Sequence, residues 1–469
     1  MLKGKTTIEL TDVNTGEKNV VEEENMITNA LSNIFAPLGH LINADAIYNQ
    51  YNMYYQKLLG GLLLFDNTIE EDANQIYAPA NTNLVGCAIY NKQNNTTGKM
   101  RGGYNQTESE FNSKKKYMKF VYDFSTSQAN GTIACVALTS QQGGGTSYGS
   151  SDAVLDSDNS LALTPYNNLL QYAHSSYTGA DTGDQYSGCT VGTTELLFLL
   201  DIDNDIAYYV KIKSATSISI VKRRMYLKSV SVFENPYAKK ALIEEFDLAE
   251  LGTALKTNYI GYNFDTTKKY LYIFTCANYT TAVNGTFLIT RIKMSDWSIT
   301  QYTMTNTTGE TLSTSGTRFA FADDGFVYLK GYESPYEIYK FEIGNSANVI
   351  KIKRNGMSAT TGVPVLEING RIYYQTFGNS PSSSRVYIVN RETNECLKIE
   401  NYCLYAYYNA ACYTPVLNHP MLFYASYGSY STGGFFIMAN YLATINNLSE
   451  PVTKTADKTM KITYTIQEQ

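Results

Sequence analysis

Apolar and polar residues alternate in short runs through the second half of the chain, and these runs come in related pairs. The first run of each pair begins at Tyr270 (YLYIF), Phe326 (FVYLK), Arg371 (RIYYQ) and Met421 (MLFYA). The second begins at Thr286 (TFLITRI), Tyr336 (YEIYKFEI), Arg385 (RVYIVN) and Gly434 (GFFIMAN). Because alternation with a period of two residues is typical of half-buried strands, each pair predicts a β-hairpin.

The spacing of these hairpins indicates the architecture. Equivalent runs recur every 45 to 56 residues, close to the 40 to 50 residues of one β-propeller blade. The hairpin pattern DIDNDIAYYVKI, from Asp201 to Ile212, adds one more unit, so we expect a propeller-like domain of about five blades. A β-sandwich with long hairpins is the alternative.

The N-terminal region has a mixed pattern. KTTIEL and KNVVEE flank the turn DVNTGE and predict a hairpin. Apolar residues at helical spacing then predict two short helices, within residues 25–39 and 43–61. Strand patterns dominate from Gly61 to Ser140, whereas residues 141–188 are rich in Gly and Ser and predict a loop or an extended arm. We therefore expect a β-sandwich-like N-terminal domain with two short helices.

The chain ends in one further strand pattern. Met460, Ile462, Tyr464 and Ile466 alternate with polar residues, and this run does not resemble the repeated hairpins. It could close the propeller ring, but we expect it to return to the N-terminal sheet and to pair near KTTIEL or KFVYDF. The predicted domains are 1–200 plus 450–469, for attachment, and 201–449, the propeller.

Charge and hydropathy exclude several classes of partner. The chain has 37 Lys and Arg against 43 Asp and Glu, a net charge of −6, and no long basic block. A nucleic-acid partner would require a basic patch and is not expected. The longest apolar run, Gly60 to Phe65, is far too short to span a membrane, and the first residues lack a signal-peptide pattern. We expect synthesis in the cytoplasm, without secretion or membrane insertion.

Tyrosine is the most unusual component. There are 41 Tyr, against 19 Phe and 1 Trp. Tyr is frequent in strands, and its flat ring with a polar tip also suits binding surfaces. Most of these rings are expected to pack between blades, because aromatic residues are mainly buried. The seven Cys lie in apolar or Tyr-rich text without any C-x-x-C pair, and are expected to be buried free thiols.

The sequence carries no catalytic or cofactor motif that we recognise. The three His are not paired at the spacing of a zinc site, and the Gly-rich run QQGGGTS lacks the Lys of a phosphate-binding loop. Asp201, Asp203 and Asp205 alternate as in a calcium loop, but Ile206 stands where such a loop requires Gly. We expect a hairpin turn there, and no metal, cofactor or catalytic residue in the chain.

One enzymatic alternative stays open. Glycoside hydrolysis requires two carboxylates at a defined separation, and Glu244, Glu245, Asp323 and Asp324 are the candidates. However, Asp323-Asp324-Gly325 also has the composition of a tight turn, and Glu244-Glu245 that of a solvated strand edge.

Both ends of the chain resemble a known class of proteins. The segments are GKTTIELTDVNTGE, EENMITNAL, SQANGTIACVALTS and KTADKTMKITYTI. They resemble virion proteins of tailed bacteriophages and prophages of Gram-positive gut bacteria, of the tail-fibre, baseplate-associated or receptor-binding type. The resemblance covers about a third of the chain. It implies a structural component of the phage particle, at the tail, and assigns no functional residues.

This resemblance sets the expected function and partners. We expect a tail protein, present in the virion, that contacts other virion proteins, forms a homo-oligomer and binds a glycan or protein of the host surface. Two alternatives are an architectural protein of the collar, neck or capsid and a virion-associated glycan hydrolase. Tyr-rich loops suit stacking on sugar rings, and the candidate ligand-binding residues are Tyr407, Tyr408, Tyr427 and Tyr430.

Overall fold

The structure is a computed structural model, and every element in its described part is a β-strand. It describes residues 2–30, 59–80, 82–94, 98–112, 114–139, 189, 191–224, 242–314, 319–355, 362–368, 370–376, 385–399, 412–426, 435–438 and 441–468. The two predicted helices and the segment 141–188 lie mostly or wholly outside these ranges. Among the described residues, no helix is long and apolar enough to cross a membrane. The chain is mainly β, as predicted.

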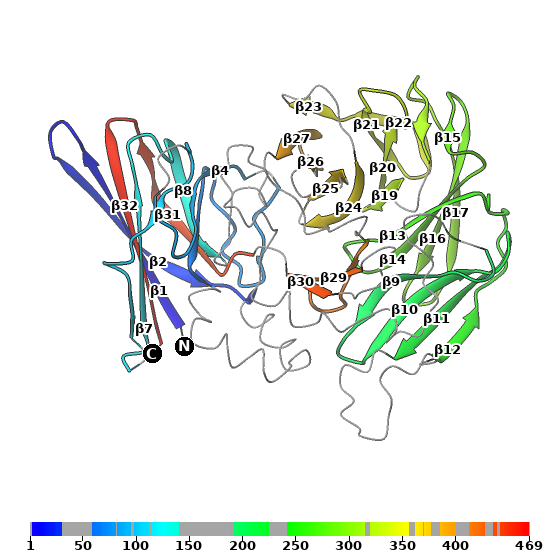
Figure 1. Ribbon diagram of the computed structural model, residues 1–469, viewed down its shortest axis with the longest axis horizontal. Coiled ribbons are helices and arrows are strands. Elements are labelled where there is room, and N and C mark those ends of the chain that lie inside the picture. The colour runs from blue at the N-terminus through cyan, green and yellow to red at the C-terminus, as the bar shows by residue number, and fades with distance from the viewer. Residues whose placement is uncertain are drawn as a thin grey trace.

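Both chain ends form one ten-stranded sheet (Figure 1). Its strands are β1 (Leu2–Asp12), β2 (Lys18–Ile27), β3 (Gly61–Phe65), β4 (Leu84–Ala88), β5 (Gly103–Tyr104), β6 (Glu110–Asn112), β7 (Tyr117–Phe124), β8 (Gly131–Thr139), β31 (Thr444–Lys454) and β32 (Lys458–Glu468). Their order is β4-β3-β8-β31-β2-β1-β32-β7-β5, with β6 beside β7. The predicted N-terminal β-rich domain is therefore present as one curled, nearly closed sheet.

The last strand returns to the start of the chain, as predicted. β32 lies between β1 and β7 and pairs antiparallel with both, so it contacts both predicted partner segments. Its inward residues Met460, Ile462, Tyr464 and Ile466 are all buried because alternate side chains of a strand face the same side. The predicted hairpin near the N-terminus is also formed, by β1 and β2.

Five smaller sheets follow one another between β8 and β31. The first sheet consists of β9 (Glu195–Asp201), β10 (Ile206–Ile212), β11 (Ile218–Arg224) and β12 (Leu242–Asp247), and the second of β13 (Tyr259–Phe264), β14 (Tyr270–Cys276), β16 (Thr286–Lys293) and β17 (Ile299–Thr305). The third consists of β19 (Ala320–Asp323), β20 (Phe326–Gly331), β21 (Ile338–Glu342) and β22 (Asn345–Lys351), with the short strands β15 (Thr280–Thr281) and β18 (Leu312–Ser313). The fourth consists of β24 (Val363–Ile368), β25 (Arg371–Thr376), β26 (Arg385–Asn390) and β27 (Glu395–Ile399), with β23 (Lys353–Asn355), and the fifth of β28 (Cys412–Pro415), β29 (Leu422–Ser426) and β30 (Phe435–Met438). Each is a blade, and the hairpins predicted from the sequence are the second and third strands of blades two to five.

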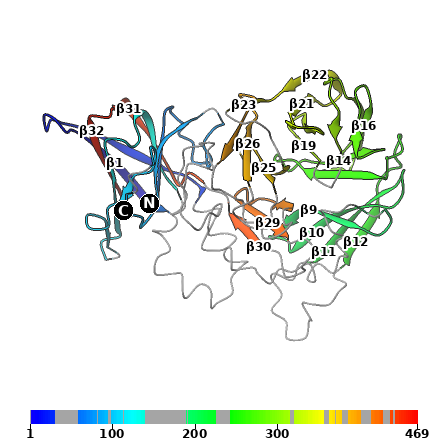
Figure 2. The same cartoon turned by 45° about the horizontal axis from the view of Figure 1, so that its top comes forward.

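The blades form a ring around their first strands (Figure 2). Each first strand contacts the next one: β9 contacts β13, β13 contacts β19, β19 contacts β24, β24 contacts β28, and β28 contacts β9. Polar side chains join neighbouring blades inside this ring. Tyr262 donates to the carbonyl of Leu197 at 3.0 Å, and the Asn263 amide exchanges two hydrogen bonds with the backbone of Ala322. This closed ring of five sheets is a β-propeller.

The ring closes without a shared blade. In the described part of the chain, the sheets of blades one and five take no strand from the other end of the propeller, although β15, which lies between β14 and β16 in sequence, joins the sheet of blade three. Blades one and five meet instead through a parallel bridge between Leu200 and Val416. Both ends of the propeller then enter the ten-stranded sheet, where β8 and β31 are antiparallel neighbours. The strands that precede and follow the propeller in sequence are therefore paired with each other.

The changes between sheets fall near the predicted domain boundaries. The predicted boundary at 200/201 lies inside β9, which belongs to the first blade, and the one at 449/450 lies inside β31, which belongs to the ten-stranded sheet. One apolar cluster continues across the junction, from Ile462 in the N-terminal domain to Leu200 and Val416 in the propeller. The two parts share a core at this point.

Much of the tyrosine is structural. Nine Tyr are among the largest fully buried side chains: Tyr122, Tyr209, Tyr262, Tyr272, Tyr328, Tyr373, Tyr374, Tyr441 and Tyr464. Six of these rings are on propeller strands, whereas Tyr122 and Tyr464 belong to the ten-stranded sheet. Five cysteines are free thiols: Cys87, Cys135, Cys276 and Cys396 are buried, and Cys189 is half-buried.

Candidate ligand-binding cavity

The four acids selected from the sequence are not brought together, and the four selected tyrosines are not described by the structure. Tyr407, Tyr408, Tyr427 and Tyr430 lie outside the described residues. Glu244 pairs with Lys222 at 2.8 Å and its neighbour Glu245 with Lys211 at 3.4 Å. These two acids lie on β12, the outermost strand of the first blade, as expected for a solvated edge.

The other proposed pair of acids has a different location. Asp323 ends β19, the first strand of blade three, and is fully buried. Asp324 and Gly325 have φ of 48° and 79° and turn the chain into β20, and the Asp324 side chain is 81% exposed. The predicted tight turn is present, and the four acids form no common catalytic pair.

The Asp201–Asp205 segment is also a turn. The Asp201 carboxylate accepts hydrogen bonds from the backbone and side chain of Asn204, at 3.0 and 2.7 Å. Asp205 has a φ of 61°, typical of a tight hairpin connection. Asp203 instead faces His419 of blade five, with 3.1 Å between its Oδ1 and Nε2. The described residues contain no group of three or more His, Cys, Asp or Glu able to hold a metal ion.

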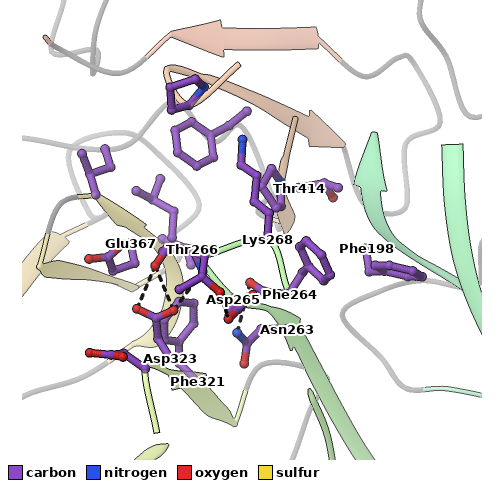
Figure 3. Close-up of a pocket in the computed structure, with 18 of the residues that line it drawn as sticks. Phe198, Asn263, Phe264, Asp265, Thr266, Lys268, Phe321, Asp323, Glu367 and Thr414 are labelled. Carbon is purple, nitrogen blue, oxygen red and sulfur yellow. Dashed lines mark hydrogen bonds between the residues drawn. The ribbon is translucent and has the colours of Figure 1, made fainter. Parts of the chain in front are cut away.

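A cavity of about 470 Å³ opens where the first strands of the five blades converge (Figure 3). All five first strands line it, and Tyr77 is contributed by the N-terminal domain. Aromatic rings make up much of its wall: Phe198, Tyr262, Phe264, Phe321 and Phe423. A cavity of this size, whose walls combine aromatic rings with polar and charged side chains, is suited to a small-molecule ligand.

Buried carboxylates lie at one side of this cavity. Asp323 accepts two hydrogen bonds of 2.9 Å from Thr266, one from its backbone N–H and one from its hydroxyl. Its other oxygen pairs with Arg391, whose side chain is only 15% exposed. Glu367 lies 3.5 Å from the same guanidinium nitrogen and accepts a hydrogen bond from the backbone of Gly370. The Arg391 guanidinium therefore lies within ion-pair distance of both Asp323 and Glu367.

This arrangement shifts the titration of Glu367. Burial, reinforced by the negative charge of Asp323, raises the pKa of Glu367 to about 7, although Arg391 opposes the shift. Burial also raises the pKa of Asp265, which caps the turn after β13 by accepting hydrogen bonds of 2.9 Å from the backbone N–H groups of Lys269 and Tyr270. Asp265, Asp323 and Glu367 thus all accept hydrogen bonds from groups of the protein itself.

The N-terminal domain supports the cavity from one side. The Tyr77 hydroxyl donates to the carbonyl of Pro420 at 2.8 Å. Nearby, the Arg371 guanidinium donates to the carbonyls of Ala78 and Pro79 at 3.0 and 2.9 Å. These bonds hold the segment around Tyr77 against blades four and five. The cavity therefore lies at a junction between domains, a common place for ligand sites.

Sequence reasoning missed Arg391, Thr266 and Glu367 because they come from three different blades, the first two from turns and Glu367 from β24. One signal was available. In four blades an acid stands at the end of the first strand or one residue from it, at Asp201, Asp265, Asp323 and Glu367, and each of these acids is buried. Aligning the repeats on their first strands would have exposed this repetition, whereas the longer second and third strands hide it.

No protein-family model matches this sequence, and no curated protein matches it. Among solved structures it is similar to the β-propeller domain of the trilobed protease from Pyrococcus furiosus, with 8% identity and a TM-score of 0.25, over 69% of this chain and 77% of that chain. Pyrococcus horikoshii acylaminoacyl peptidase matches with 8% identity and a TM-score of 0.26, over 69% and 42% of the two chains. Prolyl oligopeptidase B from Galerina marginata matches with 10% identity and a TM-score of 0.28, over 74% and 42%.

These values are too low to transfer an activity. The chain spans less than half the length of the two peptidases just named. The assignment as a β-propeller therefore rests on the strand pairing and the closed ring of first strands.

Proposed function

We propose that this protein is a ligand-binding structural protein of a tailed bacteriophage particle. In this proposal the propeller binds a small polar part of the host surface in its central cavity, and the ten-stranded domain attaches the propeller to other virion proteins. The observation that carries the binding role is the cavity, because all five blades contribute to it and its walls combine aromatic rings with polar groups. The resemblance of the chain ends to phage virion proteins supports the placement on the particle.

A binding role accounts for the cavity better than glycoside hydrolysis does. The four acids considered from the sequence are divided between β12 of blade one and the β19–β20 turn of blade three. Within the cavity, Asp323 is held by Thr266 and Arg391, and Glu367 lies beside the same guanidinium. A nucleophile or general base needs a carboxylate free to reach the substrate, and these carboxylates are engaged in structural hydrogen bonds.

A cell-wall binding assay with the full-length protein tests the proposal. Thr267 is exposed and lines the cavity, so Thr267→Trp should fill the cavity while leaving the blades intact. Thr300→Trp is the matched control, because Thr300 is an exposed residue of the outer strand β17. We expect T267W to lose sedimentation with purified cell walls of the Gram-positive host, and T300W to keep it.

The fold of both variants is checked by circular dichroism and thermal unfolding. Unchanged cell-wall binding by folded T267W would reject a role for the cavity in attachment. No binding by the wild-type protein would favour the architectural alternative, in which the protein serves the collar, neck or capsid without a receptor.

A further inference from the structure

A cation that forms no ion pair with any described carboxylate lies in the wall of the cavity. Lys268 belongs to the turn between β13 and β14, and its ammonium donates one hydrogen bond, to the backbone carbonyl of Val416. No carboxylate of the described residues lies within ion-pair distance of it, and burial lowers the pKa of Lys268 to about 8. Two of its three N–H donors are left without an acceptor among the described residues.

The backbone at Lys268 is also unfavourable for a lysine. Its φ is 58°, in the left-handed region where Gly, Asn and Asp are preferred. A long side chain at such a position, without a counter-ion, lowers stability on two grounds. Residues of this kind tend to be found at functional sites.

A second donor lines the same cavity. Thr414 of β28 is only 1% exposed, and its hydroxyl has no hydrogen-bond partner among the described residues. Thr414 lines the same cavity, two residues before Val416, which binds the Lys268 ammonium. Figure 3 shows Lys268 and Thr414 in the same part of the cavity, apart from Asp323 and Glu367.

This part of the cavity therefore has more hydrogen-bond donors than acceptors. The acids Asp265, Asp323 and Glu367 already accept hydrogen bonds from the protein, whereas Lys268 and Thr414 have donors to spare. A ligand that reaches both must present oxygen atoms and, opposite an ammonium, negative charge. The rings of Phe198 and Phe264 beside them offer apolar faces for the body of the ligand.

We propose that Lys268 and Thr414 bind the carboxylate or phosphate group of a sugar-sized ligand in the central cavity. This inference rests on the proposed function and deepens it, since it makes the bound part of the host surface an acidic group. Phe198 and Phe264 pack against the ring of the ligand.

Three monosaccharides that differ only at carbon 6 test this: glucose, glucuronate and glucose 6-phosphate. Their affinities for the full-length protein are measured by isothermal titration calorimetry at neutral pH. We expect one or both acids to bind and glucose to bind at least about tenfold more weakly. The two acids separate a carboxylate ligand from a phosphate ligand. Equal affinity for all three, or no binding of either acid at about 10 mM, would overturn the proposal.

Two variants test whether Lys268 and Thr414 are the donors that bind the acidic ligand. Lys268→Met removes the charge but keeps the length of the stem, and Thr414→Val removes only the hydroxyl. Each should weaken binding of the acid by about tenfold or more. Lys330→Met is the matched control, because Lys330 also donates to a backbone carbonyl, that of Gly362 at 2.8 Å, and burial lowers its pKa to about 8, but it lies outside the cavity lining. Unchanged affinity in folded K268M would reject the assignment.

The two proposals fail in different ways. Loss of cell-wall binding by T267W without preference for an acid would leave the attachment role in place and reject the acidic ligand. Binding of an acid that depends on Lys268, together with unchanged cell-wall binding by T267W, would confirm the anion site and reject the attachment role of the cavity.

Discussion

The backbone N–H of Leu417 donates a hydrogen bond of 2.7 Å to the carbonyl of Leu200, and so joins the fifth blade to the first. The adjacent Val416 forms the parallel bridge with Leu200, and its carbonyl accepts the hydrogen bond from Lys268. The seam of the ring and the wall of the cavity are thus built from the same few residues. A change at the seam is expected to affect both.

The first prediction concerns this seam. Leu417→Pro removes the donor and leaves the buried carbonyl of Leu200 without this partner, so we expect a loss of stability of about 1–3 kcal/mol. Leu417→Ala is the control, since it keeps the N–H while shortening the side chain. Urea unfolding of both variants measures the difference. Equal stability of L417P and L417A would show that the hydrogen bond does not hold the seam.

The second prediction concerns Arg391. Arg391→Met leaves Asp323 and Glu367 buried without their shared cation, and removing one partner of a buried ion pair typically costs about 3–5 kcal/mol. Lys293→Met, which breaks an exposed pair with Asp296, should cost less than about 1 kcal/mol. Urea midpoints of the two variants test this contrast. A cost below about 1 kcal/mol for R391M would contradict the role given to Arg391.

The third prediction is a pH dependence from Glu367. Its pKa is raised from 4.5 to about 7, so between these values the folded state binds more protons than the unfolded state. Stability should therefore fall as pH rises from 4.5 to 7, and Glu367→Gln should remove this part of the fall, with a gain of about 1–3 kcal/mol above pH 7.

Urea unfolding of the wild type and E367Q at several pH values measures this effect. Glu392→Gln is the control, since Glu392 is an exposed residue of the β26–β27 turn. The same pH profile in wild type and E367Q would show that Glu367 is not the group that titrates.

The fourth prediction separates stability from binding at Lys268. The pKa of Lys268 is lowered from 10.5 to about 8, so between these values the unfolded state binds more protons and stability rises with pH. Lys268→Met removes the buried charge and should be more stable than the wild type at pH 7, by about 1 kcal/mol, while losing the acidic ligand. Thermal unfolding at neutral pH and near pH 10 checks this. A clearly less stable K268M would make Lys268 a structural residue.

The sequence predicts the framework well where local pattern decides it. The alternation around Met460 and Ile462 predicts a strand, and its partners followed from the N-terminal hairpin. The repeated runs from Tyr270 to Met421 predict the blades because the second and third strands are long and regular.

The cavity could not be predicted in the same way. Its polar groups come from turns and strand ends that the ring brings together only after the blades have assembled. Lys268, Arg391 and Thr414 are on three different blades, and none follows a motif. The four acids at the ends of first strands were visible in the sequence, but a single acid before a turn is also what an ordinary hairpin contains. Only the burial of these acids marks them as part of a site.

The position of β8 beside β31 gives the molecule a modular character. The backbone N–H of Ala443 bonds the carbonyl of Leu138 at 2.8 Å, so the chain leaves the ten-stranded sheet and re-enters it at nearly the same point. Genetic exchange at these two positions would replace one propeller by another while every strand of the N-terminal domain kept its partners. Under the proposed function, such recombination would change the host range, within the limit set by the apolar cluster at the junction, and would leave the attachment domain unaltered.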